Sequence, residues 1–308
     1  MNRPQLTDVF RLERLLPRAG TIDMVLDTDT YNEIDDQFAV VYSLVSPERL
    51  NVRALYAAPF YNERSESPGD GMERSYEEII RLLSRMNVAT DHFVFRGATA
   101  YLPDAATPVV SDAAAHLIQT ALAQTEAPLY VAAIGAITNV ASAILMEPKI
   151  IEKIIVVWLG GHAYFRPHTA EFNLIQDIHA ARLIFDCGVP LVHIPCHGVA
   201  SHLITTASEI ESFVRGCGPI GDYLADIFQD FHTDHFGVSK VLWDIATIAW
   251  LINPEWIATD LVHSPILTDQ ATWSFDTSRH LIRAAHTAFR DPIFRDFFTK
   301  LRTVHSAV

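Results

Sequence analysis

Two hydrophobic patterns alternate along the first 200 residues of the chain. Short, nearly continuous apolar runs are typical of parallel strands that are buried on both faces. They occupy residues 22–26, 52–58, 92–95, 129–134, 154–159 and 190–194. Segments with the spacing of an amphipathic helix lie between them, at residues 37–45, 76–85, 112–123, 140–145 and 179–186. This alternation predicts an α/β fold: a doubly wound, mostly parallel sheet flanked by helices.

The pattern changes after residue 194. Helical spacing dominates there, with candidate helices near residues 208–214, 223–231, 240–252 and 292–301 and one late strand near 273–276. The chain has no internal repeat, low-complexity run or Gly/Ser linker that would separate two domains. We therefore expect a single domain (1–308), in which a Rossmann-like core (1–200) is followed by a mainly helical C-terminal part (201–308) that forms a cap.

The amino-acid composition excludes some classes of binding partner. Of the 308 residues, 49% are apolar and 19% are charged, so a large core can form. The formal charge of −14 argues against nucleic acid and anionic membranes as partners. The sequence has no apolar stretch of about 20 residues, so no transmembrane helix is expected. The N-terminus lacks the apolar segment of a signal peptide, and the three cysteines are too widely spaced for a disulfide framework or zinc site, which favours a cytoplasmic protein.

The first apolar run ends in an unusual concentration of carboxylates: Asp27, Asp29, Asp35 and Asp36. Such groups repel one another unless a cation or a hydroxyl-rich ligand lies among them. Asp35 could instead cap the helix that follows, where a negative charge gains roughly 0.3–1 kcal/mol. Capping explains one carboxylate and not four, and hard oxygen ligands favour Ca²⁺ or Mg²⁺ over zinc.

Polar residues also follow later strands, where ligands bind in open α/β sheets. Asn62 follows the second predicted strand, Thr138 the fourth, and Glu171 and Asn173 the fifth. These residue types suit sugar hydroxyls, although Thr138 could simply cap a helix. Asp244 interrupts the apolar helix predicted at 240–252, so it either faces the core with a partner or faces solvent.

At these positions the chain resembles the inosine-uridine-type nucleoside hydrolases, over nearly its whole length from about Asp23 to Pro254. The resemblance rests on several motifs in the right order. They are Asp27-Thr28-Asp29 with Asp35-Asp36, Gly135-Ala136-Ile137-Thr138-Asn139, Leu159-Gly160-Gly161, Ala170-Glu171-Phe172-Asn173, Asp177-Ile178-His179-Ala180-Ala181, and Trp243-Asp244-Ile245 in place of the family's His-Asp-Pro.

The resemblance implies Ca²⁺-dependent hydrolysis of the N-glycosidic bond of ribonucleosides, giving ribose and free base, by a homodimer or homotetramer. It assigns the calcium ion to Asp29, Asp36, Asp244 and the carbonyl of Thr138. It makes Asp29 the general base for the attacking water and places Asp27 behind the cluster as support. It assigns the ribose hydroxyls to Asp35, Asn62, Glu171 and Asn173. Hydrolysis of this kind develops positive charge on the sugar, which surrounding carboxylates stabilise.

Two departures from the family pattern concern the substrate. Residues 30–34 include two more residues than the family loop, so Asn32 or Glu33 is expected to reach the pocket. Trp243 replaces a leaving-group histidine, as in the purine-specific branch, where stacking on the base is worth on the order of 1–3 kcal/mol. Alternatively Trp243 only packs, and His232 or His235 supplies the proton. Residues expected to line the base pocket are Trp158, His162 and Phe236.

Two other classes remain open at this stage. One is a nucleoside- or ribose-binding protein with weak or no turnover. The other is a phosphatase with an Asp-x-Asp motif, which ranks lower because Tyr31 stands where such enzymes carry Thr or Val.

Overall fold

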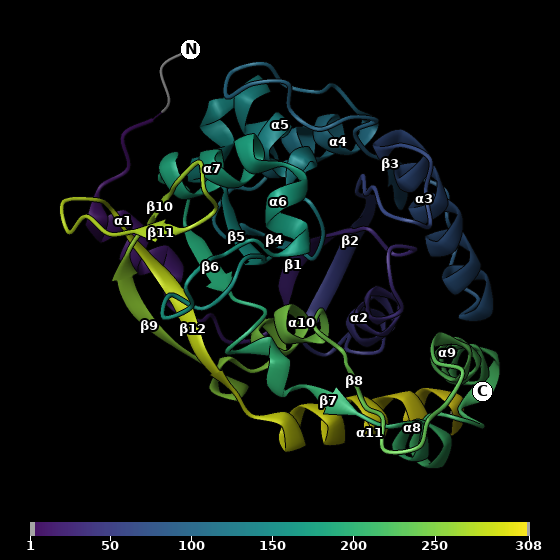
Figure 1. The fold of residues 1–308 in the computed structure, drawn as a ribbon. Coiled ribbons are helices and arrows are strands. Elements are labelled where there is room, and N and C mark those ends of the chain that lie inside the picture. The colour runs from purple at the N-terminus through teal and green to yellow at the C-terminus, as the bar shows by residue number, and fades with distance from the viewer. Residues whose placement is uncertain (1–3, 307–308) are drawn as a thin grey trace.

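In the computed structural model, which describes residues 4–306, eight strands form one central sheet (Figure 1). Their order is β3-β2-β1-β4-β5-β6-β12-β9. Their bounds are β1 Ile22–Thr28, β2 Leu50–Ala57, β3 Val94–Arg96, β4 Leu129–Ala133, β5 Ile154–Leu159, β6 Leu191–Ile194, β9 Ile257–His263 and β12 Leu281–Ala288. All neighbours pair in parallel except β9, which is antiparallel to β12. The predicted doubly wound, mostly parallel sheet is therefore confirmed.

Helices cover both faces of this sheet, and each face has its own hydrophobic core. One core packs against α4 (Asp112–Leu122), α5 (Thr138–Met146) and α7 (Ile178–Asp186). The other involves α2 (Asp35–Leu44), α3 (Pro68–Arg85), α9 (Gly218–Phe231), α10 (Ile245–Ile252) and α11 (Arg290–Ser306). The first five strands along the chain carry side chains into both cores, which is why their sequences read as almost unbroken apolar runs.

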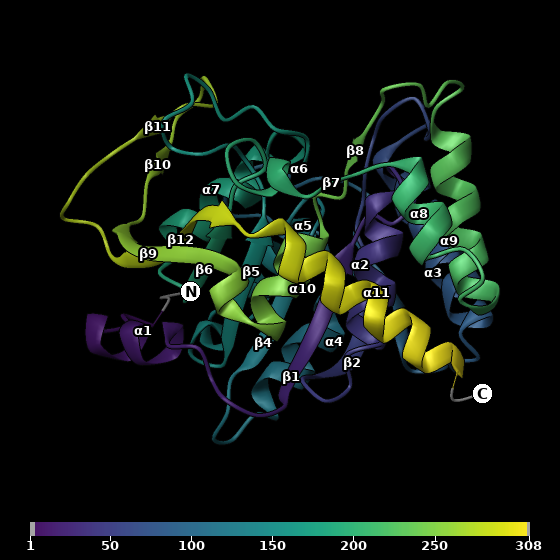
Figure 2. The same cartoon turned by 90° about the horizontal axis from the view of Figure 1, so that it is seen from below.

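The C-terminal part is helical, as expected, but it also supplies two strands of the main sheet, β9 and β12. Figure 2 shows α11 running from the end of β12 across the molecule toward α8 (Ala207–Phe213) and α9. The late strand exists as β11 (Trp273–Ser274), paired with β10 (Ile266–Leu267). The helix predicted at 240–252 begins only at Ile245, because β8 (Lys240–Val241) pairs with β7 (Ile204–Thr205). The remaining helices are α1 (Asp8–Leu15) and α6 (Phe172–Gln176).

The strand order places a crevice at the carboxyl end of β1. The neighbours of β1 are β2 on one side and β4 on the other, so the chain reverses its direction of winding there. Asp27 pairs with Tyr56 of β2 and is the last residue of β1 to pair with β4, at Ala133, while Thr28 still pairs with Ala57 of β2. Such a switch point is where open α/β sheets bind ligands.

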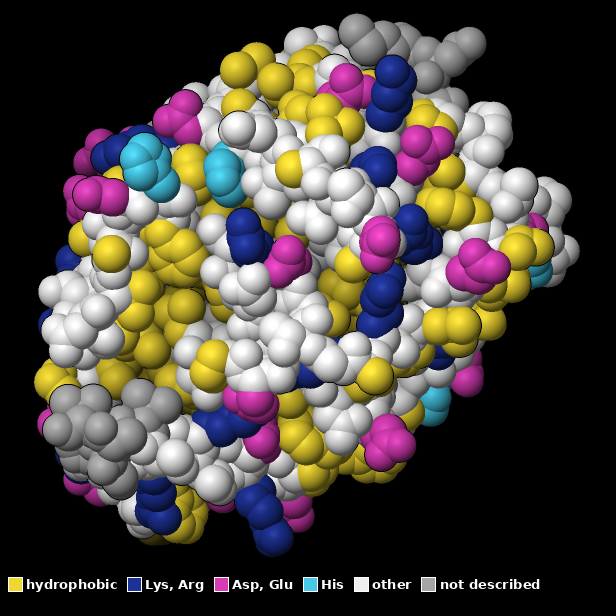
Figure 3. Space-filling view, turned by 180° about the vertical axis from the view of Figure 1, so that it is seen from behind, with side chains coloured by type: hydrophobic (Ala, Val, Ile, Leu, Met, Phe, Trp, Pro, Cys, Tyr) yellow, Lys and Arg dark blue, Asp and Glu magenta, His cyan; other side chains and the backbone are white. Residues whose placement is uncertain are grey.

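The face opposite the view of Figure 1 mixes charges of both signs with hydrophobic side chains (Figure 3). Acidic and basic residues are interspersed on it, and no large basic patch is visible. Among residues 4–306, no helix is long and apolar enough to cross a membrane.

Candidate active site

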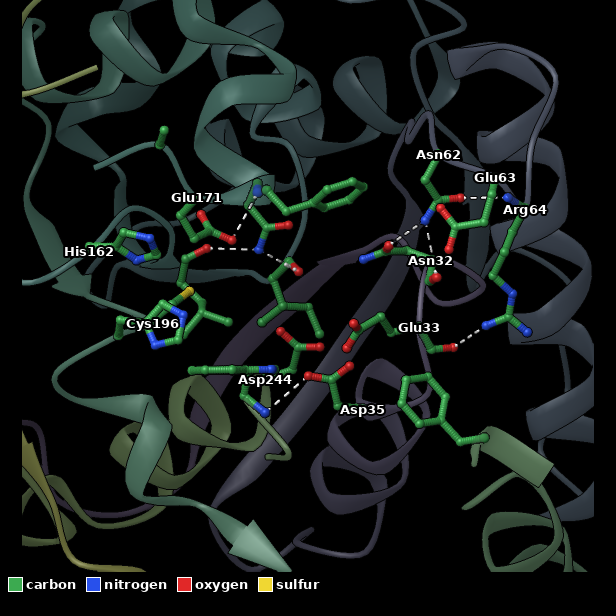
Figure 4. A pocket seen from close by; sticks show the side chains of 18 residues that line it. Asn32, Glu33, Asp35, Asn62, Glu63, Arg64, His162, Glu171, Cys196 and Asp244 are labelled. Atoms are coloured by element: carbon green, nitrogen blue, oxygen red, sulfur yellow. Dashed lines mark hydrogen bonds between the residues drawn. The ribbon is translucent and has the colours of Figure 1, made fainter. Parts of the chain in front are cut away.

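A cavity of about 470 Å³ opens at the carboxyl ends of the central strands (Figure 4). Its size lies within the range of roughly 300–1,000 Å³ common for small-molecule sites. The chain lines it with the first loop, the loop after β2, the segment between β5 and α6, and the segments before β7 and before α10, together with Ile134 after β4 and Phe231 at the end of α9. The lining side chains include Asn32, Glu33, Asp35, Asn62, Glu63, Arg64, His162, Glu171, Phe172, Asn173, Cys196, His197, Phe231, Trp243 and Asp244.

The floor of this region is built from buried carboxylates. Oxygens of Asp35, Asp36 and Asp244 lie within 4.8 Å of one another. The Thr28 hydroxyl donates to one oxygen of Asp36 at 2.5 Å, whereas the other has no hydrogen-bond partner among the described residues. Both oxygens of Asp29 are buried and likewise lack a partner within residues 4–306. A buried charge without a partner is costly, so the site calls for protons or a cation.

The same crowding raises the pKa values of the carboxyls. Burial, followed by the charge of Asp35, raises the pKa of Asp36 to about 8. Burial and the neighbouring carboxylates raise the pKa values of Asp29 and Asp244 well above their usual range. Burial raises the pKa of Asp27 to about 7, against the opposing effect of its hydrogen bond from Asn139. Unpartnered, hard oxygen donors of this kind fit a divalent cation such as Ca²⁺ or Mg²⁺.

The sequence left two purely structural roles open, Asp35 as a helix cap and Asp244 as a solvent-facing residue, and both are wrong. Asp35 does not cap α2: the N-cap is Ile34, and the carboxylate of Asp35 accepts a 3.0 Å bond from the main-chain N–H of Trp243. Asp244 does not face solvent, because it is 4% exposed and stands at the N-cap of α10. The structure therefore brings together the two acidic segments that the sequence separates.

Thr138 and Asn139 open α5 without capping it. The Thr138 hydroxyl donates to Asp177 at 2.7 Å. The Asn139 amide donates to Asp27 at 2.8 Å and to the Ala57 carbonyl at 3.2 Å. Asn139 thus ties the carboxylate at the end of β1 to the end of β2.

Glu171 and Asn173 line the cavity in fixed orientations. The Glu171 carboxylate accepts main-chain bonds from Gly161 (2.7 Å), Asn173 (3.0 Å) and Leu174 (3.2 Å), so it caps the short helix α6. The Asn173 amide donates to the carbonyls of Ile134 and Leu159, both at 3.1 Å. Glu171 is thus held by α6 and by Gly161 just after β5, and Asn173 by the main chain at the ends of β4 and β5.

One end of the cavity is aromatic. The Trp243 ring meets His197 edge-to-face, with ring centroids 5.1 Å apart, and His162 lies 4.8 Å from His197. Burial, and next the proximity of His197, lowers the pKa of His162 to about 4, so this imidazole is neutral at pH 7. His197 was not among the residues predicted from the sequence, although it follows β6 closely, as the other site residues follow their strands.

Some candidates for the base pocket are wrong. Trp158 is fully buried and its indole N–H donates to the Gly135 carbonyl. Phe236 is 93% exposed. Neither residue lines the cavity, and neither do His232 and His235, which lie beyond Phe231.

A crevice floored by buried carboxylates at the switch point of a doubly wound sheet defines an α/β protein with a polar small-molecule site. Residues 24–289 match the sequence profile of the inosine-uridine preferring nucleoside hydrolases. The chain belongs to this family and is therefore a nucleoside hydrolase, an enzyme that cleaves the N-glycosidic bond of ribonucleosides.

Individual relatives agree with this assignment. The chain is 29% identical over 270 residues to the pyrimidine-specific ribonucleoside hydrolase RihA of Escherichia coli O127:H6, covering 77% of this chain and 82% of the relative. A solved purine-preferring ribonucleoside hydrolase from Gardnerella vaginalis superposes with a TM-score of 0.74 at 17% identity, covering 93% and 100% of the two chains. A plant nucleoside hydrolase superposes with a TM-score of 0.71 at 20% identity, covering 91% and 99%. These two structures show the shared fold.

Proposed function

We propose that the protein is a Ca²⁺-dependent N-ribohydrolase that releases ribose and free base from ribonucleosides. The observation that carries the metal dependence is the set of buried carboxylate oxygens of Asp29 and Asp36 that have no partner within the described residues. In this proposal Asp29, Asp36, Asp244 and the carbonyl of Thr138 hold the ion, and Asp35 lies close enough to add a further oxygen. A bound Ca²⁺ would supply positive charge that acidifies and orients the attacking water.

The chain's own residues then divide the remaining work. Asp29 accepts the proton of the water, since neither of its carboxylate oxygens has a hydrogen-bond partner within the described residues. The sugar hydroxyls are bound from the cavity wall by Asp35, Asn62, Glu171 and Asn173. The carboxylates around the sugar stabilise the positive charge that develops as the glycosidic bond breaks.

We place the nucleobase against Trp243, with His197 and His162 beside it. Stacking on the indole favours a purine as the base. It also helps the base to leave although position 243 carries no acid to protonate it. The name of the RihA relative supports a pyrimidine instead, whereas that of the Gardnerella enzyme supports a purine. His232 and His235 are less suited as leaving-group acids than His162 and His197, which do line the cavity. A homodimer or homotetramer stays a prediction of the family resemblance, and a cytoplasmic location stays a prediction from the N-terminal sequence and the three cysteines.

The proposal is tested by assaying metal-stripped protein with and without added CaCl₂ or MgCl₂. The substrates are inosine, guanosine, uridine, cytidine and p-nitrophenyl riboside, and the product is ribose measured as reducing sugar. We expect no turnover without metal, recovery with Ca²⁺, and higher kcat/KM for purine than for pyrimidine nucleosides. Full turnover after exhaustive chelation would refute the metal dependence, and a preference for uridine or cytidine would refute the purine assignment.

A further inference from the structure

The junction between α6 and α7 holds together loops that follow three different strands. It consists of Gln176, the last residue of α6, and Asp177, the N-cap of α7. Asp177 is also the first residue of the motif at 177–181. Its side chain is 2% exposed and does not line the cavity. Asp177 can therefore act on the reaction only through other residues.

Both carboxylate oxygens of Asp177 accept hydrogen bonds. Oδ1 accepts the main-chain N–H of Ala180 at 2.9 Å, which caps α7. Oδ2 accepts the main-chain N–H of Leu102 at 2.9 Å and the hydroxyl of Thr138 at 2.7 Å. The Thr138 hydroxyl is the donor of this bond, because a carboxylate only accepts. One side chain thus ties the start of α7 to the loop after β3 and to the first turn of α5, which lies beside α7 (Figure 1).

Thr138 is the residue whose main-chain carbonyl is assigned to the metal in the proposed function. It is fully buried and is the first residue of α5. The turn that leads to it lies against the acidic floor, since a Cβ on Gly135 would lie 3.0 Å from an oxygen of Asp29. Threonine is branched at Cβ and stiff, so a bond that holds its hydroxyl also restrains the backbone of the same residue. The bond to Asp177 accordingly limits how far the Thr138 carbonyl can move.

Gln176 ties the same junction to other loops by bonds that do not involve Thr138. Its side-chain oxygen accepts the main-chain N–H of Tyr61 at 2.9 Å and the hydroxyl of Tyr101. Its amide nitrogen donates to the Tyr61 carbonyl at 3.0 Å. Gln176 therefore makes three side-chain hydrogen bonds, as Asp177 does, and only Asp177 reaches the residue assigned to the metal.

We propose that Asp177 is a positioning residue for the metal site: by holding the hydroxyl of Thr138 it fixes the carbonyl of that residue, and so sets the affinity for Ca²⁺. This inference rests on the proposed function, since it concerns the ion that the same site would hold. A group that orients a metal ligand without touching the metal strengthens binding, because a ligand that must first be ordered binds more weakly.

The test measures the Kd for CaCl₂ by calorimetry on protein that a chelator has freed of metal. Asp177→Asn keeps the shape of the side chain but leaves one oxygen to serve three donors. Losing an interaction behind a metal ligand typically lowers metal affinity by roughly 10- to 100-fold, and we expect the Kd to rise by this factor.

Asp104→Asn is the matched control for the loss of a carboxylate. Asp104 accepts from the main-chain N–H groups of Ala106 and Thr107 and from a threonine hydroxyl, that of Thr107, at 2.7–2.9 Å. It is exposed and has no bond to Thr138. The Kd for CaCl₂ should stay within about threefold of wild type.

Thr138→Val breaks the same bond from the other side and leaves Asp177 to cap α7. Valine keeps the branched shape and the main-chain carbonyl and loses only the hydroxyl. We expect the Kd to rise roughly 10- to 100-fold here too. The double variant Asp177→Asn/Thr138→Val should bind no more weakly than Asp177→Asn, since both changes break one bond. Thr138→Ser, which restores a hydroxyl, should recover most of the affinity.

Gln176→Met separates the proposed route from a general loosening of the junction. Methionine matches glutamine in length and removes all three bonds of the amide. We expect a distinctly smaller rise in the Kd than in Asp177→Asn, even where urea unfolding shows that both variants have lost similar stability. An equal rise would overturn the inference, because loosening of the junction would then explain both.

An unchanged Kd in Thr138→Val would also overturn the inference, and this variant decides the question if Asp177→Asn does not fold. So would an unchanged Kd in a folded Asp177→Asn, which would then serve the fold alone. Failure of the proposed function has a separate signature. A wild type that binds no CaCl₂ in the same titration would refute the metal site together with this inference, whereas tight binding by wild type and variants alike would refute this inference only.

Discussion

The main-chain N–H of Trp243 donates a 3.0 Å hydrogen bond to the carboxylate of Asp35, which lies 208 residues earlier in the chain. This bond fastens the segment before α10 to the start of α2. It thereby brings Asp244 beside Asp36, and it places the Trp243 ring at the edge of the same cavity. The acidic site is complete only because these two distant segments meet.

Replacing Trp243 by Ala tests the ring without removing this hydrogen bond, because the donor is the main chain. If the indole stacks on a purine, Trp243→Ala should lower kcat/KM for inosine by roughly 10- to 100-fold, the equivalent of about 1–3 kcal/mol. Hydrolysis of p-nitrophenyl riboside, whose leaving group needs little activation, should fall much less. Steady-state kinetics on both substrates gives the comparison, and equal losses would assign Trp243 a packing role.

Asp29 should be indispensable for turnover and yet unfavourable for the stability of the metal-free protein. Its carboxylate is fully buried, and neither oxygen has a partner within the described residues. Asp29→Asn should reduce kcat by at least about 10³-fold through loss of the base. It should also raise Tm in EDTA at neutral pH, since the buried carboxyl must otherwise take up a proton on folding or ionise without a partner. Kinetics and thermal unfolding of both proteins measure the two effects.

The control for Asp29 compares the stability of wild type and Asp29→Asn with and without Ca²⁺. Wild type should gain stability when Ca²⁺ is added, and Asp29→Asn should gain less because one ligand has been weakened. Normal activity of the variant would show that another residue is the base. An identical gain with Ca²⁺ would show that Asp29 is not a ligand.

The raised pKa values of Asp27 and Asp36 predict how stability depends on pH without metal. These pKa values are about 7 and about 8 in the folded protein, against 3.8 for an unperturbed aspartate. Between pH 4 and 8 the folded state therefore binds more protons than the unfolded state, so the free energy of unfolding should fall as pH rises. Urea unfolding in EDTA at pH 5, 6, 7 and 8 should show this decline.

Calcium should oppose this fall of the free energy of unfolding with rising pH, because the cation takes the place of the protons on the carboxylates. At a Ca²⁺ concentration about 100 times the Kd, the gain should be about 2.7 kcal/mol, which for a chain of 308 residues is roughly 4 °C in Tm. At one fixed Ca²⁺ concentration, the gain in the free energy of unfolding should be larger at pH 8 than at pH 5, because fewer protons compete with the ion. Stability in EDTA that rises with pH over this interval would contradict the buried, protonated carboxyls.

The sequence predicted the parallel strands well, because strands buried on both faces leave an apolar run that needs no tertiary information. It missed β9 and β12, because six of the seven residues of β9 and four of the eight residues of β12 are half-buried or exposed, so that neither an apolar run nor a clean alternation marks them. It also started α3 at residue 76, although Ser67 caps the helix and Pro68 follows as its first residue.

The residues of the candidate site that come just after a strand could be predicted from the sequence. Glu171 and Asn173 line the cavity as expected, and Glu33 and Asn32 reach it through the longer loop. The pairing of Glu33 with Lys240 could not be predicted, because it depends on how the segment before α10 folds back over the first loop. Local patterns carry no information on such contacts between distant segments.

Replacing Asn139 tests whether the stability of the fold depends on a neutral hydrogen-bond partner for the buried Asp27. Its amide donates to Asp27 and to the Ala57 carbonyl, while its oxygen accepts from the Ala98 N–H at 2.7 Å. Asn139→Asp would place a second carboxyl against Asp27 in a fully buried site. Asn51→Asp is the matched control, since Asn51 also donates to an aspartate, Asp23, but does so at the exposed start of the sheet.

We expect Asn139→Asp to cost about 3–5 kcal/mol at pH 8, where both carboxyls are driven to ionise, and distinctly less at pH 5, where one can stay protonated. Asn51→Asp should cost less than about 1 kcal/mol at either pH, because water screens exposed charges. Urea unfolding of both variants and wild type in EDTA measures these differences. If the cost of Asn139→Asp were the same at pH 5 and pH 8, charge repulsion at Asp27 would not be its cause, and Asn139 would act through its bonds to Ala57 and Ala98 alone.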